Sequence, residues 1–99
     1  MIATKVSDLT ASSIAEYIRL VDPTADDLNT LASLLTIAKS YVTQYTGKTL
    51  AKLDDYPDIV IVVMILCQDM WDNRTLYIED SSLNKTVESI LGLHSENLL

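Results

Sequence analysis

The chain is poor in the residues that make turns and cross-links. Its 99 residues contain no phenylalanine, two glycines, two prolines and one cysteine. Because a meander of tight hairpins needs more turn residues than this, an all-β barrel or sandwich is not expected. The single Cys67 excludes an internal disulfide and a zinc cluster of several cysteines.

Long apolar segments and positive charge are also scarce. The longest unbroken apolar run, Ile59 to Cys67, has nine residues, whereas a membrane-spanning helix needs about twenty. The N-terminus lacks the apolar core of a secretory signal, so we expect a soluble protein with no membrane partner, in an intracellular or assembled-particle context. The formal charge is −7, and such a chain is not expected to grip DNA, because phosphate binding is driven by cations.

What the chain does contain is apolar periodicity of the helical kind. Apolar residues form 48% of the sequence, which is enough for a single domain over residues 1–99. A first helix is predicted from Thr10 to Leu20, capped by Thr10 or Ser13, and it should stop before Pro23. Its apolar face is expected to consist of Ile14, Tyr17, Ile18 and Val21.

A long second helix is predicted from Thr24 to Thr46. Thr24 suits the N-cap, two aspartates follow in the first turn, and Gly47 suits the left-handed position after the last turn. The expected apolar stripe consists of Leu28, Leu31, Ala32, Leu35, Ala38, Val42 and Tyr45, widened by Leu34, Ile37 and Tyr41.

The third segment fits both a buried strand and a helix by propensity. Residues 59–63 are β-branched throughout, which suits a strand. Pro57 in a first turn, helical spacing as far as Trp71 and the lack of a partner strand favour a helix that is apolar all round. In a chain this short, we expect such a helix to be buried partly by other subunits.

A short last helix is predicted from Ser81 to Leu91, capped by Ser82 or Asn84 and ended by Gly92. The sequence therefore predicts an all-α fold. It is a small bundle of about four helices, with one long central helix pair and short N- and C-terminal helices. The tail at 93–99 ends on leucines, and because free tails are usually polar, we expect it to dock on something.

No catalytic, cofactor-binding or metal site is predicted. Gly47-Lys48-Thr49 is similar to the end of a phosphate loop. The full motif requires a glycine five residues before Gly47, but that position is Val42. A phosphate loop must also precede a helix, whereas this motif is expected to end one. Cys67 and His94 are conceivable as a nucleophile pair. However, Cys67 lies in the most apolar stretch, where a thiol is inert and behaves as a core residue.

The end of the third segment carries Trp71 and Arg74, one helical turn apart. A tryptophan in a buried helix is usually core, yet Trp and Arg are also the residues most enriched in interface hot spots. Both interpretations stay open. Asp69 and Asp72 could bind a cation or do acid–base work, but a solvated acidic face, or a partner for Arg74, is the ordinary explanation.

The order of several short motifs resembles the small head–tail connector proteins of tailed phages and prophages, also called DNA-packaging adaptors. Tyr17-Ile18-Arg19-Leu20 ends the first helix as a Tyr-Leu-Arg-like segment does in that family. The segment from Tyr41 to Leu50 is similar to its Tyr-x-x-x-Tyr-Thr-Gly helix ending. Trp71-Asp72-Asn73-Arg74 is similar to its aromatic-x-Asn-Arg, and Ile90-Leu91 resembles its closing Leu-Leu segment. The loop at 52–56 departs from the family in being rich in aspartate.

The resemblance implies a structural virion protein with no catalytic residues and no cofactor. Such proteins form a homo-oligomeric ring beneath the portal vertex, extend the DNA channel after packaging and support the head-closure or tail protein. It places the chain in the virion neck, and in the host cytoplasm before assembly, with DNA passing through without specific binding. Subunit contacts are expected at Trp71, Asn73, Arg74, Tyr41 and Tyr45, and portal docking at Leu91, Leu93, Leu98 and Leu99.

Two other classes of function stay open. One is a small acidic regulator that acts as a dimer on a phage or host protein, with a surface that mimics DNA. The carboxylates are scattered from Asp8 to Glu96 and form no dense stripe, which weighs against it. The other is an enzyme, which would need a polar constellation that the sequence does not display.

Overall fold

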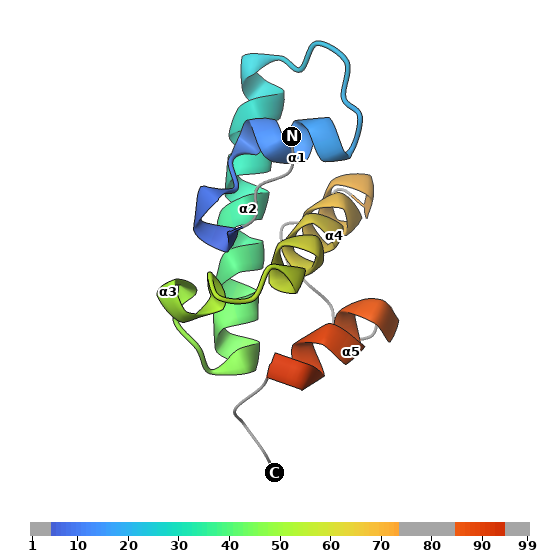
Figure 1. Cartoon of the computed structure of the whole chain (residues 1–99). Helices are drawn as coiled ribbons and strands as arrows, with labels where there is room; N and C mark the ends of the chain where they lie inside the picture. The colour runs from blue at the N-terminus through green and yellow to red at the C-terminus, as the bar shows by residue number, and fades with distance from the viewer. Residues whose placement is uncertain (1–4, 74–84, 95–99) are drawn as a thin grey trace.

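The computed structural model describes residues 5–73 and 85–94. Every regular element in those ranges is helical, which confirms the predicted all-α bundle. The longest helix is α2, and α1 and α4 pack across it, while α5 packs against both α2 and α4 (Figure 1). In chain order the elements are η1 (Val6–Asp8), α1 (Ala11–Tyr17), α2 (Ala25–Thr46), α3 (Leu50–Leu53), α4 (Asp58–Asn73) and α5 (Lys85–His94).

The ends of α2 follow the sequence prediction. Thr24 and Asp27 form a capping box, in which the Asp27 amide donates to Thr24 Oγ1 at 3.1 Å and the Thr24 amide donates to Asp27 Oδ2 at 3.0 Å. Gly47 ends the helix in the left-handed conformation, with a φ of 73°. These caps satisfy backbone groups that a helix end otherwise leaves to solvent.

The buried face of α2 is narrower than the predicted stripe. Ala32 is exposed and Tyr45 is 38% exposed, so both lie outside the core. The buried side chains follow the line along which α1, α4 and α5 pack against α2. They are Leu31, Leu34, Leu35, Ala38 and Val42, with Thr46 in the last turn.

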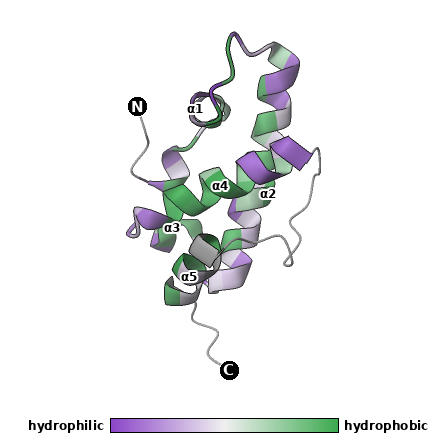
Figure 2. Ribbon diagram, turned by 90° about the vertical axis from the view of Figure 1, so that its right-hand side faces the viewer, coloured by the Kyte–Doolittle hydropathy of each residue, from purple (hydrophilic) through white to green (hydrophobic). Residues whose placement is uncertain are grey.

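The core is built around α4, which is the apolar third segment. Its fully buried side chains are Ile59, Val60, Val62, Val63, Met64, Leu66, Cys67 and Met70. This helix packs against α1, α2 and α5. Figure 2 shows that most of α4 before its C-terminal end is hydrophobic. The chain itself therefore buries most of α4, and partial burial by other subunits stays a prediction for its outward side alone. Ile61 is the exception, with 47% of its surface exposed.

The first helix is shorter than predicted. Thr10 caps it, as expected, and the helix ends at Tyr17. The Leu20 amide donates to the Ala15 carbonyl at 3.0 Å and the Arg19 amide donates to the Glu16 carbonyl at 3.1 Å. This is the hydrogen-bond pattern of a Schellman turn, with Arg19 at the left-handed position that glycine usually occupies.

Because the chain turns there, the predicted continuation of the helix to Leu20 is wrong. Val21, which was expected on the buried face of that helix, is instead 84% exposed.

The last helix, α5, continues through Gly92 to His94, so Gly92 does not end it. Its proposed caps, Ser82 and Asn84, lie outside the described residues. Val87 and Leu91 anchor α5 in the core. Gly92 faces open space, because a Cβ built on it meets no other atom within 4 Å.

Two short elements were not foreseen in the sequence. In η1, Val6 is fully buried, and Leu9 follows it into the core. Asp54, just after α3, accepts hydrogen bonds from the Ser7 amide at 3.0 Å and the Ser7 hydroxyl at 2.7 Å. This contact joins the N-terminal turn to a segment nearly half the chain away in sequence. The two hydrogen bonds favour the ionised carboxylate, and they lower the pKa of Asp54 below its usual 3.8.

The two glycines provide a matched test of the backbone. Gly92→Ala should raise the free energy of unfolding by about 0.5–1 kcal/mol, because alanine favours helix and nothing obstructs its methyl group. Gly47→Ala should lower it by about 1 kcal/mol, because the left-handed conformation at that position disfavours a Cβ. Urea unfolding measures both, and a stabilising Gly47→Ala would contradict the assigned helix end.

Ser7→Ala should destabilise the protein in a pH-dependent way. The lowered pKa of Asp54 stabilises the fold above the unfolded-state pKa, and this contribution is lost as the pH falls through the lower folded-state value. The difference from the parent chain should therefore be larger at neutral pH than in acid below the usual pKa of aspartate. Ser12→Ala, at an exposed position on α1, is the control without pH dependence. An equal effect of Ser7→Ala at both pH values would contradict a role for the carboxylate.

Candidate functional site

The two tyrosines expected at a subunit interface lie together near the end of α2. The rings of Tyr41 and Tyr45 are one helical turn apart, with centroids separated by 6.0 Å and planes tilted by 35°. Tyr41 packs against the core, while Tyr45 is 38% exposed. The pair therefore forms a surface with an anchored inner ring and an accessible outer ring, which suits a protein contact.

The other expected interface residues lie at the end of α4. Trp71 is half-buried and packs against the core, so at least part of its surface has the core role. Asn73 is exposed, and its side-chain amide donates to the Asp69 carbonyl at 2.8 Å and to Asp69 Oδ1 at 3.1 Å. Arg74 lies outside the described residues.

The two groups of expected interface residues do not form one patch. Figures 1 and 2 place the C-terminal ends of α2 and α4 apart in both views. The motif residues near the end of α2 and those near the end of α4 are therefore two separate candidate contact sites.

Only one of the expected portal-docking leucines is exposed within the described residues. Leu93, on α5, is 79% exposed. Leu91 is fully buried between α5 and the rest of the core, so its side chain is not available to a partner and that expectation is wrong. Leu98 and Leu99 lie outside the described residues.

Cys67 has the properties of a core residue. Its side chain is fully buried in α4, and burial raises the pKa of the thiol to about 12. The thiolate is the reactive form of cysteine, so at neutral pH this group is a poor nucleophile. His94 ends α5, but its side chain lies outside what the structure describes, so the proposed pair has no defined geometry.

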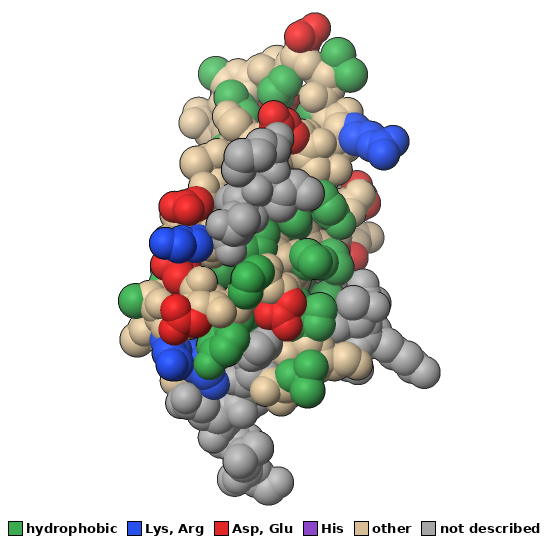
Figure 3. Space-filling view, viewed as in Figure 1, with side chains coloured by type: hydrophobic (Ala, Val, Ile, Leu, Met, Phe, Trp, Pro, Cys, Tyr) green, Lys and Arg blue, Asp and Glu red, His purple; other side chains and the backbone are tan. Residues whose placement is uncertain are grey.

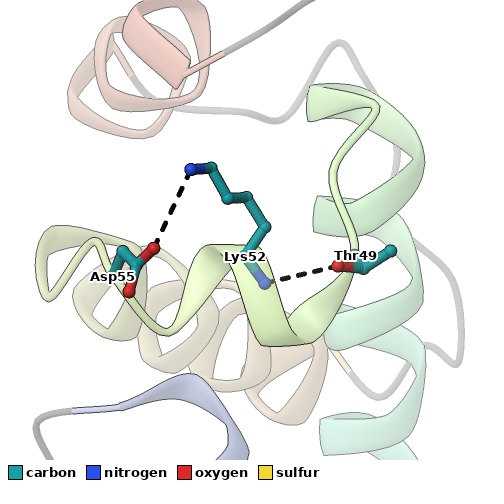
Figure 4. A network of polar contacts seen from close by, with 3 residues as sticks. All are labelled: Thr49, Lys52 and Asp55. Atoms are coloured by element: carbon teal, nitrogen blue, oxygen red, sulfur yellow. Dashed lines mark hydrogen bonds and ion pairs between the residues drawn. The ribbon is translucent and has the colours of Figure 1, made fainter.

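The other candidate motifs have structural roles. Gly47 is the left-handed end of α2, and Thr49 Oγ1 accepts from the Lys52 amide at 3.3 Å at the start of α3 (Figure 4). Lys52 Nζ lies 3.9 Å from Asp55 Oδ2, and both side chains are more than half exposed, so this ion pair contributes little stability.

The described residues also offer no group of three or more His, Cys, Asp or Glu side chains that could hold a metal ion. Nor is any helix among them long and apolar enough to cross a membrane.

Comparison of the chain with known protein families, with curated proteins and with solved structures gave no match.

Among the described residues, the most exposed large apolar side chain is one that the sequence did not predict to be exposed. Val21 lies in the loop at 18–24, between Arg19 and Asp22, which both have positive φ angles. Helical spacing placed Val21 on a buried face, because the pattern carries no information on a left-handed residue that ends the helix early. The Pro23 signal located the loop, but not the start of the turn at Arg19.

The buried thiol gives a direct chemical prediction. In the folded protein, an alkylating reagent at about pH 8 should modify Cys67 far more slowly than a free thiol, because the reactive thiolate is suppressed. Modification should become rapid in denaturant. Val21→Cys provides the control, since the introduced cysteine is at an exposed position and should react at once. Rapid single-site alkylation of the folded parent chain would contradict the burial of Cys67.

Proposed function

We propose that this chain is a structural subunit of a virion head–tail connector. In this role, copies form a ring at the portal vertex, connect the head to the tail or head-closure protein, and extend the DNA channel. The order of the motifs in the sequence supports this proposal, and so does the small helical bundle in which they lie.

The observation that carries the proposal is the distribution of exposed apolar side chains over a bundle with a completed core. In the part of the chain that the structure describes, they are Val21 in the α1–α2 loop, Tyr45 on α2, Ile61 on α4 and Leu93 on α5. Single exposed apolar residues are common on any protein. Here, however, they lie on four different elements, which suits a subunit that meets a copy on each side and other proteins along the ring axis.

The negative charge of the chain is compatible with a channel through which DNA passes. Its net charge of −7 means that a channel built from it would not hold the phosphate backbone tightly, so DNA could slide. A channel wall lined by Lys39, Lys48 and Lys52 would contradict this part of the proposal. The function requires no catalytic step, because its work is assembly.

Light scattering on the chain, alone and mixed with the portal protein of the same genome, tests the proposal. A multi-subunit complex that co-elutes with the portal protein is expected. Leu93→Glu should weaken the affinity for the portal protein by about tenfold or more, since it places a charge in an apolar contact. Ala51→Glu adds the same charge at an exposed position on α3 and is the matched control.

The outcomes separate the function from the docking residue. If Leu93→Glu binds the portal protein as the parent does, the docking site is elsewhere and the connector function stands. A stable dimer that ignores the portal protein would contradict the connector and favour the acidic regulator.

A further inference from the structure

The loop between α1 and α2 holds an apolar side chain in solvent at a conformational cost. Val21 is 84% exposed and lies between Arg19, with a φ of 61°, and Asp22, with a φ of 48°. The left-handed conformation is unfavourable for residues other than glycine. Aspartate adopts this conformation more readily than most residues, so Arg19 is the less expected of the two.

The rest of the loop is firmly attached to the bundle. The Schellman turn fixes its beginning, Leu20 packs against the core, and Thr24 caps α2 at its end. Both ends of the loop that carries Val21 are therefore held in place by the bundle. The position of Arg19 is one where glycine would fit better, so the guanidinium is the feature that distinguishes the loop from an ordinary helix end.

A second exposed surface has the complementary chemistry. On the outward side of α4, Ile61 is 47% exposed and Ile65 is half-buried one turn later. Asp58 precedes them and Asp72 follows them along the same side of the helix, because steps of three, four and seven residues return to one face. We call these four residues the α4 stripe. Figure 3 shows hydrophobic side chains gathered over α4, with acidic side chains among and beside them.

We propose that the Arg19–Val21 loop of one copy of this chain packs on the α4 stripe of a second copy. Val21 covers the two isoleucines, and the Arg19 guanidinium meets a carboxylate at one end of the stripe, which is the anion geometry that arginine recognises best. The occupant is a second copy because one chain carries both halves. One is an apolar tip with the Arg19 cation on one side and Asp22 on the other, and the second is an apolar strip between anions.

This contact is heterologous, since the two surfaces are different. Each copy can offer its loop to one neighbour and its α4 stripe to another, so the contact propagates and closes into a ring if the rotation allows. In that respect the inference rests on the proposed connector function and names the surfaces by which neighbouring subunits meet. A contact made by one short loop is weak between two copies alone, with a dissociation constant on the order of 1 mM. Closing the ring strengthens the assembly, because every copy then makes two such contacts.

Cysteine cross-linking between copies tests the contact, and buried Cys67 does not compete. Val21→Cys and Ile61→Cys chains are mixed at about 1 mM total protein, at physiological salt, and oxidised. A disulfide-linked heterodimer is expected, and the double variant should give a ladder of oligomers. Val21→Cys mixed with Leu93→Cys is the control, because Leu93 lies on α5 and is more exposed than Ile61, so accessibility alone would favour the control pair. No product above this control would contradict the proposal.

A pair of glycine substitutions separates association from folding. Arg19→Gly and Asp22→Gly both relieve a left-handed residue, so neither should lower the thermal unfolding midpoint. Arg19→Gly should weaken self-association several-fold, since it removes the cation, whereas Asp22→Gly should leave it unchanged or strengthen it by removing a carboxylate that faces an acidic stripe. Equal effects of the two variants on sedimentation would overturn the role of Arg19.

The failures of this inference and of the connector function are distinguishable. If a ring forms on the portal protein while the Val21 and Ile61 cysteines never cross-link, the function stands and the assigned surfaces are wrong. If the cysteines cross-link and the portal protein is ignored, the contact between copies stands and the connector is wrong.

Discussion

The structure depends on the burial of one helix. α4 is apolar on almost every side, and a chain of 99 residues can shield such a helix only by surrounding it. α2 covers the longest side of α4, and α1 and α5 cover two others, which leaves its outward side in solvent. Because the core residues of α2 and α5 point toward this helix, the arrangement of the bundle follows from the need to keep α4 out of water.

That constraint also explains which side chains remain for other proteins. The outward side of α4 stays accessible, and Ile61 is its exposed large apolar residue. The apolar residues that the core does not use are left at the periphery, on the α1–α2 loop, at the end of α2 and on α5. The exposed apolar side chains at these outer points are the surfaces that the proposed assembly would use.

The sequence predicted the helices well where local signals were strong. Thr24, Asp27 and Gly47 determine the ends of α2 by hydrogen bonding and backbone conformation within a few residues, so their effect can be recognised without tertiary information. Pro57 and the long apolar repeat likewise favoured a helix over a strand for α4. The prediction that Gly92 ends α5 was wrong because glycine is also tolerated within a helix, at a modest cost.

The features that depend on tertiary structure could not be predicted. The burial of Leu91 and the exposure of Val21 are decided by the path of the chain around α4, which periodicity does not encode. The contact between Ser7 and Asp54 joins segments that are distant in the sequence, so no local sequence pattern predicts it. The expected interface residues Tyr41, Tyr45, Trp71 and Asn73 follow from motifs, and they belong to the ends of two helices that lie apart. Their role in assembly remains a prediction.

The central claim is that this chain works by assembling around an axis. The most direct measurement is electron microscopy of the chain bound to the portal protein, with the Val21→Cys/Ile61→Cys disulfides formed. The account predicts a closed ring, coaxial with the portal, in which each α1–α2 loop touches the α4 of the next subunit. Isolated subunits, or dimers with no common axis, would contradict it.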